Sequence, residues 1–307
     1  MSSGSEIIYE FLRPLRTTTK KMLAEGLRDG FKVEVKCPPD FYSDVEVVTQ
    51  FLPGAVPTDP IRTQIYKPKN PNPPIVLYIH GGGWSMEQSD DYLMMLKKIS
   101  AISGVMIVAI NYRLAPENPF PAGLEDCLAA FRWLRAHGKE IGGNPGQIVI
   151  GGDSAGGNFT FALTLKLKQE KETLPQGLFG LCPLTDMIFE NYPSWVKLAN
   201  NNFIYDAAFA GFIRGAYANC DQWTHPFVSP MYGELSGLPP SFVIGGTEDP
   251  LVDDNRAFAR KLKEAGVETE LHVHEGMPHA FYCFTGLIPE EGQALDQLKI
   301  FLQRIVK

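Results

Sequence analysis

No run of apolar residues in this chain reaches the roughly 18 positions that a membrane-spanning helix needs. The N-terminal segment "MSSGSEIIYEFLRPLRTTTKK" does not have the order of basic, apolar and small residues of a signal peptide. Cysteine is scarce and no C-x-x-C pair occurs, so neither a zinc site nor a disulfide framework is indicated. We therefore expect a cytosolic protein with free thiols, no metal and no membrane span. The cysteines are Cys37, Cys127, Cys182, Cys220 and Cys283.

Basic residues are fewer than acidic ones and are dispersed along the chain. The 28 Lys and Arg residues against 35 Asp and Glu residues give a net charge of -7 at pH 7. This balance argues against nucleic acid or an anionic membrane as a main partner. The 307 residues contain no internal repeat, and their 44% hydrophobic content is ordinary for a globular protein with a large core.

Short apolar segments alternate with segments of helical periodicity along most of the chain. Buried strands that alternate with amphipathic helices indicate the α/β class, with a mostly parallel sheet and helices on both faces. The predicted strands are 45–52, 61–68, 71–80, 105–112, 146–152, 177–184, 240–246 and 268–275. The predicted helices are 6–27, 90–104, 121–138, 155–170, 255–266 and 294–307.

The segment 185–226 breaks this alternation. It lies between two predicted core strands and is far longer than an ordinary connection in an α/β protein. Its aromatic residues, among them Phe203, Phe209 and Phe212, follow a loosely helical spacing. We expect it to form a lid over the carboxyl ends of the strands, where open sheets bind ligands. The alternative is a helical hairpin with no role in binding.

The motif "GDSAG" stands between a predicted strand and a predicted helix. It matches G-x-S-x-G, in which a serine on a sharp, strained turn exposes its hydroxyl as a nucleophile. In such a turn the residues two before and two after the serine crowd each other. Both positions are glycine here, Gly152 and Gly156, as this crowding requires. The backbone N–H of Ala155 begins the helix and points toward charge that develops beside the serine. A phosphate-binding loop would need a lysine that the motif does not contain.

Three consecutive glycines, 81–83, follow another predicted strand in "YIHGGGW". Glycines allow a backbone to approach a reacting carbonyl closely, so Gly82 and Gly83 are predicted to donate their N–H groups to an oxyanion together with Ala155. His80 and Gly81 are predicted to support this loop. His80 could also be read as a catalytic base, but its place directly before the glycines favours an orienting hydrogen bond.

Several motifs together resemble the hormone-sensitive-lipase-like carboxylesterases of the α/β-hydrolase fold. They are "HGGGW", "NYRLAPENPFPAGLEDC", "GDSAGGN", "SGLPPSFVI", "EDPL" and "GMPHAF", in the family's order. The resemblance implies an α/β-hydrolase with a mostly parallel eight-stranded sheet flanked by helices, and hydrolysis of carboxylic esters. It implies a single domain, 1–307, with a helical cap from about 1–40 plus 185–226 and a catalytic core of about 41–184 and 227–307. Alanine stands in "PHAF" where glycine is commoner.

The other catalytic residues are assigned by chain order. His279 follows the last strand, where an α/β hydrolase carries its base, and the matching motif supports this choice. Four acidic residues follow the preceding strand: Glu248, Asp249, Asp253 and Asp254. Asp253 and Asp254 are interpreted as carboxylates at a helix N-terminus. Asp249 matches the family's D-P-L motif and is therefore the predicted acid, which would orient His279.

These assignments predict a serine carboxylesterase that forms an acyl-enzyme and needs no cofactor. Trp84 and the lid aromatics Phe203, Phe209 and Phe212 are expected to line a pocket for short to medium acyl chains. A non-hydrolytic receptor on the same fold and an amide or carbamate hydrolase remain alternatives. The resemblance also supports a homodimer through the last strand, which is expected at a sheet edge.

Overall fold

A computed structural model describes residue 6 and residues 40–88, 91–201 and 205–307 of the chain, except for the side chains of Asp91 and Asn201. Its strands are β1 Glu46–Leu52, β2 Ile61–Lys67, β3 Pro74–Ile79, β4 Met106–Ile110, β5 Asn144–Asp153, β6 Gly177–Leu181, β7 Ser241–Gly246 and β8 Thr269–His274. Its α-helices are α3 Asp91–Ser103, α4 Ala122–His137, α5 Ala155–Gln169, α6 Pro193–Leu198, α7 Ala207–Tyr217, α8 Val252–Glu264 and α9 Pro289–Ile305.

The described strands form one eight-stranded sheet in the order β1-β2-β4-β3-β5-β6-β7-β8. The pairs from β4 onward are parallel, whereas β2 is antiparallel to both β1 and β4. The predicted strands and the predicted eight-stranded, mostly parallel sheet are thus confirmed. The parallel strands place their carboxyl ends along one edge, where the loops after β3, β5, β7 and β8 gather.

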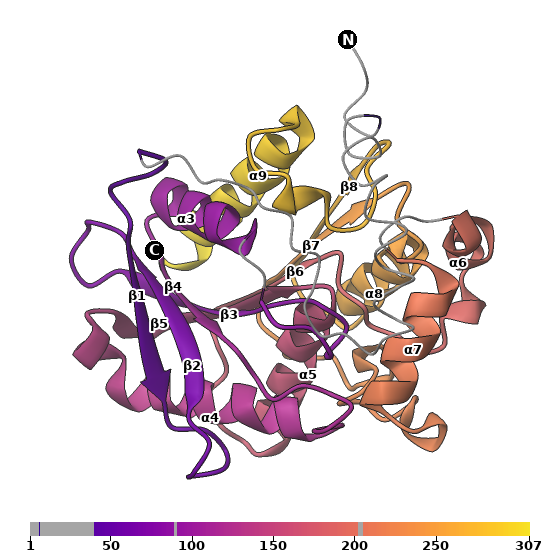
Figure 1. The fold of residues 1–307 in the computed structure, drawn as a ribbon, viewed down its shortest axis with the longest axis horizontal. Coiled ribbons are helices and arrows are strands. Elements are labelled where there is room, and N and C mark those ends of the chain that lie inside the picture. Colours follow the sequence, from indigo (N-terminus) through magenta and orange to yellow (C-terminus); the bar gives the residue numbers. More distant parts are fainter. Residues whose placement is uncertain (1–5, 7–39, 89–90, 202–204) are drawn as a thin grey trace.

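Helices cover both faces of this sheet (Figure 1). On one face, residues such as Leu77 and Ile150 pack with α4, α5 and α8. On the other face, their neighbours Val76 and Val149 pack with α3 and α9. Because successive side chains of a strand point to opposite faces, the continuous apolar runs of β3, β4 and β5 supply both cores. Among the described residues, no helix is both long and apolar enough to cross a membrane.

The insert 185–226 folds mainly into α6 and α7, with short 3₁₀ turns at Phe189–Asn191, Ala199–Asn201 and Cys220–Gln222. Asp206 caps α7 by accepting a hydrogen bond from the N–H of Phe209 at 2.8 Å, which fixes where the helix begins. The other predicted part of the cap, 1–40, lies outside the described residues apart from Glu6 and Asp40. The division into cap and core stays a prediction.

Candidate active site

Ser154 lies at the turn between β5 and α5, as the G-x-S-x-G motif predicts. Its backbone has φ 50° and ψ -116°, a conformation that side-chain-bearing residues rarely adopt. Three backbone hydrogen bonds hold the turn: the N–H of Ser154 donates to Leu181 at 2.9 Å, and its carbonyl accepts from Leu184 at 3.2 Å and from Asn158 at 3.0 Å. Ser154 as a whole residue is 7% exposed.

The two glycines of the motif are required by crowding. A Cβ at Gly152 would lie 2.6 Å from the backbone of Gly156, and a Cβ at Gly156 would overlap the carbonyl oxygen of Ile79. Real Cβ atoms do not approach other atoms so closely, so neither position can carry a side chain without moving the backbone. The turn therefore packs directly against the end of β3, the strand that leads into the glycine loop.

The predicted base and acid meet Ser154 in a continuous chain of hydrogen bonds. The Nε2 atom of His279 lies 3.0 Å from the Ser154 hydroxyl oxygen. The Nδ1 atom of the same ring lies 2.8 Å from a carboxylate oxygen of Asp249. With Nδ1 donating to the carboxylate, Nε2 is left to accept the serine proton. His279 is 4% exposed and Asp249 is fully buried, so water competes little for either bond.

Three of the four acidic candidates have different partners. Asp249 reaches His279, while Asp253 accepts a hydrogen bond from the N–H of Ser194 at 2.9 Å. Asp254 accepts from both the N–H and the hydroxyl of Thr185, at the start of the insert. Asp253 and Asp254 do lie in the first turn of α8, as predicted. They also attach the insert to the core, and burial raises the pKa of Asp254 to about 8.

The glycine loop bends back along the edge of the sheet. Gly82 and Gly83 have φ of 95° and 58°, which favours glycine, and Trp84 after them keeps a positive φ of 59°. Within the described part of the chain, no hydrogen bond uses the N–H of Gly82 or Gly83. The N–H of Ala155 is the first of α5 and has no acceptor one turn earlier in its helix. These three groups are the predicted oxyanion donors.

Asp153 connects the glycine loop to the serine turn, a role that the motif alone did not predict. One of its carboxylate oxygens accepts the N–H of Gly81 at 2.9 Å and the hydroxyl of Tyr78 at 2.7 Å. The other accepts the hydroxyl of Tyr92 at 2.6 Å. Burial raises the pKa of Asp153 to about 6, and these three hydrogen bonds oppose the rise because they favour the charged form.

His80 contacts the glycine loop and Tyr112, and these contacts are compatible with the orienting role predicted for it. Its Nδ1 atom lies 2.8 Å from the carbonyl oxygen of Gly81, and its ring stacks on Tyr112 at 4.4 Å. The hydroxyl of Tyr112 donates to the His80 carbonyl at 3.0 Å. Burial lowers the pKa of His80 to about 4, so the ring is neutral. Tyr112 therefore contacts both the ring and the backbone of His80.

The insert contacts both halves of the site. Tyr217 of α7 stacks on Trp84 at 4.3 Å with nearly parallel rings, so Trp84 is buried between the glycine loop and α7. Tyr205, which the sequence did not single out, lies 5.1 Å from the ring of His279. Phe209 packs against Tyr205 at 5.9 Å and is 8% exposed. These contacts place aromatic rings of the insert beside the predicted triad.

The other two predicted pocket residues are less informative. Phe212 is 43% exposed, so its ring lies largely at the surface of α7. Phe203 lies outside the described residues. A role of either ring in the substrate pocket stays a prediction.

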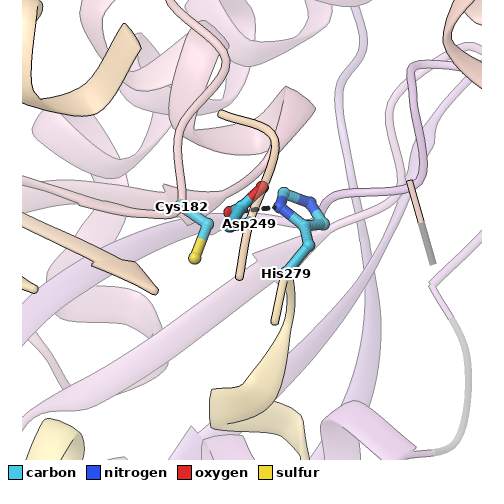
Figure 2. Close-up of side chains that lie close together, drawn as sticks. All are labelled: Cys182, Asp249 and His279. Atoms are coloured by element: carbon cyan, nitrogen blue, oxygen red, sulfur yellow. Dashed lines mark hydrogen bonds and ion pairs between the residues drawn. The ribbon is translucent and has the colours of Figure 1, made fainter. Parts of the chain in front are cut away.

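Cys182, directly after β6, also lies near the site, although the sequence analysis did not predict this. Its sulfur lies within 4.8 Å of ligand-type atoms of Asp249 and His279. Figure 2 shows the Asp249 carboxylate between the other two side chains, with its hydrogen bond to His279. Thiol, carboxylate and imidazole are also metal-ligand types. Both nitrogens of His279 already face Ser154 and Asp249, so we interpret the cluster as part of the hydrogen-bonded triad.

Comparisons with known proteins show which proteins this chain is similar to. A family model described as the alpha/beta hydrolase fold matches residues 76–283. The carboxylesterase NlhH of Mycobacterium tuberculosis is 32% identical over 88% of this chain and 86% of its own length. The ethyl acetate hydrolase of Pseudomonas putida is 30% identical over 87% and 83%. The structure of an esterase from Pyrobaculum calidifontis superposes with a TM-score of 0.85, at 26% identity, over 98% of this chain and 99% of that one.

Proposed function

We propose a catalytic mechanism from one premise: the chain belongs to the α/β-hydrolase family, in its hormone-sensitive-lipase-like branch, and is a carboxylesterase. Ser154 is the nucleophile, His279 the general base and Asp249 the residue that orients it. The observation that carries this assignment is the chain of two hydrogen bonds, 3.0 Å and 2.8 Å long, from the serine through the histidine to the aspartate.

The reaction proceeds in two half-reactions. The hydroxyl oxygen of Ser154 attacks the ester carbonyl while Nε2 of His279 takes its proton, and the N–H groups of Gly82, Gly83 and Ala155 stabilise the oxyanion. The imidazolium then protonates the leaving alcohol, which leaves an acyl-enzyme. In the second half, His279 takes a proton from water, the hydroxide attacks the acyl carbon, and the serine leaves with that proton. Asp249 stabilises the imidazolium throughout and remains ionised.

Substitution of the three residues tests the mechanism directly. Ser154→Ala, His279→Ala and Asp249→Asn should each lower kcat for a p-nitrophenyl ester by about 10⁴-fold or more, with the fold retained by circular dichroism. Glu248→Gln is the matched control, because it removes the neighbouring carboxylate and leaves Asp249 in place. A folded Asp249→Asn variant with most of its kcat would show that another group is the acid. Failure of the wild type to turn over any ester would favour a receptor.

We further propose a preference for acyl chains of about two to eight carbons. Trp84, Tyr205 and Phe209 are all at least nine-tenths buried, and such rings support a wall close to the reacting serine. Each methylene that fits adds up to about 0.8 kcal/mol, or about fourfold in kcat/KM, until the wall is met. A series of p-nitrophenyl esters from C2 to C16 should therefore rise and then drop. Undiminished activity on the C16 ester would contradict a walled pocket.

A homodimer through β8 is a second structural proposal. Among the described strands, β8 lies at one edge of the sheet, and an edge strand can pair with the same strand of another copy. Light scattering at micromolar concentration should give about twice the monomer mass, and a monomer mass would rule the proposal out.

We also propose a cytosolic location. The four described cysteines are free thiols, and a reducing compartment such as the cytosol keeps thiols in this state. Cell fractionation tests it.

A further inference from the structure

Hydrogen-bond donors from three separate segments meet at the carboxylate of Asp153. The hydroxyl of Tyr78 in β3 and the N–H of Gly81 in the glycine loop donate to one oxygen, at 2.7 Å and 2.9 Å. The hydroxyl of Tyr92 in α3 donates to the other oxygen at 2.6 Å. Asp153 is 2% exposed, so these donors replace the water that an exposed carboxylate would bind. Because Ser154 follows directly in the chain, the carboxylate joins α3 and the glycine loop to the serine turn.

The side chain of Asp153 makes a connection that the sheet itself does not. β3 and β5 pair in parallel up to Ile79 and Gly152, and Gly81 and Asp153 lie just beyond these ends. In the described part of the chain, no backbone–backbone hydrogen bond links the glycine loop, 80–83, to the serine turn, 153–156. Gly81 is followed by the two glycines predicted to be oxyanion donors. A carboxylate that fixes Gly81 therefore also fixes where their N–H groups lie.

Glycine at position 81 leaves room for this network. Gly82 and Gly83 have positive φ angles, but Gly81 does not, so its backbone conformation does not require glycine. A Cβ at Gly81 would lie 2.4 Å from Oδ2 of Asp153 and 3.1 Å from the hydroxyl oxygen of Tyr92. A side chain there would push the carboxylate out of its place. The space that glycine leaves is thus the space that the contact between Asp153 and Tyr92 occupies.

Tyr92 is the member of this network that comes from outside the site. It lies in α3, in the core on the sheet face that α3 and α9 cover, and is 9% exposed. Its ring packs edge to face on Tyr78 at 6.3 Å, so its hydroxyl reaches the carboxylate from a fixed direction. The bond of 2.6 Å has the length typical of a hydroxyl that donates to an ionised carboxylate, which is a strong hydrogen bond. Phenylalanine would fill nearly the same space, so the hydroxyl is what the network needs.

We propose that Tyr92 is a positioning residue for the oxyanion site: its hydroxyl fixes the orientation of the Asp153 carboxylate, which in turn holds the glycine loop against the serine turn. The inference rests on the oxyanion role proposed above for Gly82 and Gly83. Tyr92 acts through Asp153 and Gly81 and does not touch the substrate. Loss of its hydroxyl should let the carboxylate turn and the N–H groups of the loop shift. Binding of the developing oxyanion then weakens, while binding of the uncharged ester stays the same.

Four variants test this role. Tyr92→Phe removes the hydroxyl and keeps the ring. Asp153→Asn keeps an oxygen that can accept the N–H of Gly81, whereas Asp153→Ala keeps none. Tyr66→Phe is the matched control, because Tyr66 is fully buried in the core on the same face of the sheet and its hydroxyl donates to Gln64 at 3.0 Å rather than to Asp153.

Two inhibitors separate the oxyanion site from ester binding. The hydroxyl of Ser154 adds to the carbonyl of a trifluoromethyl ketone, and the alkoxide that forms occupies the position of the reaction's oxyanion. The matching methyl ketone binds as the uncharged ketone. The measurements are the inhibition constants of both ketones and kcat/KM for p-nitrophenyl acetate. A phosphonate ester that titrates reactive serines normalises every rate to folded enzyme.

Tyr92→Phe should lower kcat/KM and weaken the trifluoromethyl ketone by a similar factor, about 5- to 20-fold, with the affinity for the methyl ketone within about twofold. Asp153→Ala should lose about 10²-fold or more in kcat/KM, because Gly81 then has no acceptor. Asp153→Asn should lose no more than Tyr92→Phe. Tyr66→Phe should keep all three constants within about twofold of the wild type.

Wild-type constants in Tyr92→Phe, or equal losses in Tyr92→Phe and Tyr66→Phe, would overturn the positioning role, whether or not Asp153→Ala folds. Equal weakening of both ketones in Tyr92→Phe would also overturn it, because the hydroxyl would then shape the pocket rather than the oxyanion site. A loss in Asp153→Asn equal to that in Asp153→Ala would overturn the hydrogen-bond argument. Failure of the catalytic assignment itself would appear separately, as an active Ser154→Ala enzyme.

Discussion

Gly83 joins the predicted oxyanion loop to the insert, so its replacement by alanine perturbs both at once. A Cβ at Gly83 would lie 2.6 Å from Cγ2 and 2.7 Å from Cδ1 of Ile213 in α7. The positive φ of 58° adds a strain of about 1–2 kcal/mol for any L-residue other than glycine. Overpacking adds a further 1–3 kcal/mol or so. We expect Gly83→Ala to lower the free energy of unfolding by about 2–5 kcal/mol.

The cost of strain can be separated from the cost of the clash. Gly237 has a similar φ of 68°, and a Cβ there would meet nothing within 4 Å. Gly237→Ala should therefore lose only the strain energy of about 1–2 kcal/mol. Ile213→Ala removes the two nearest atoms that clash at Gly83. In a double-mutant cycle, the pair Gly83→Ala with Ile213→Ala should be about 1–3 kcal/mol more stable than the sum of the single changes.

Activity reports on the donor role of the same loop. If the added methyl displaces the N–H of Gly83 from the oxyanion, kcat for a p-nitrophenyl ester should fall by about 10²–10³-fold, with part of it restored in the double variant. Gly237→Ala should keep its kcat. Urea unfolding and steady-state kinetics on the wild type and these four variants test both expectations. A Gly83→Ala variant no less stable than Gly237→Ala and fully active would show that neither the contact with α7 nor the oxyanion role is right.

Three further predictions follow from other contacts. The native carboxyl of Asp254 keeps its proton up to a pKa of about 8, while the unfolded chain releases it near 3.8. The native state then binds more protons between these values, so stability should fall as pH rises from about 4 to 8, by up to about 1.4 kcal/mol per pH unit. Asp254→Asn should remove this slope in urea unfolding; equal slopes would contradict it. Gly156→Ala should fail to fold or lose more than about 4 kcal/mol, whereas Gly211→Ala in the open part of α7 should gain up to about 1 kcal/mol. Melting curves of the two proteins check this, and a folded, stable Gly156→Ala would refute it. Arg214 lies over the ring of Trp223 at 4.0 Å and pairs with Glu190 at 3.0 Å, so Arg214→Ala should loosen the insert and raise KM more than it lowers kcat. An unchanged KM would mean that the contacts of Arg214 with Trp223 and Glu190 do not affect how the insert binds the substrate.

Ser154 and His279 could be predicted from local geometry and chain order, and Asp249 was chosen among four acidic residues because it matches the family's D-P-L motif. The crowding of Gly152 against Gly156 is a property of one tight turn, and glycine at both positions records it in the sequence. The acid and the base follow the ends of successive parallel strands, and such ends meet at one edge of the sheet. A one-dimensional pattern is sufficient for contacts of this kind, as it was for the strands themselves.

The supporting contacts were decided only by the tertiary structure. Asp153 accepts a hydrogen bond from the N–H of Gly81, which is 72 positions away in the sequence. No motif near either residue predicts this contact. Cys182 reads in the sequence as an ordinary buried thiol, and Tyr205 as one aromatic among several in the insert. Their partners are set by the register of β6 on β7 and by the packing of the insert on the loop after β8. Periodicity determines which face a side chain takes, but the side chains opposite it come from distant segments that only the folded sheet brings together.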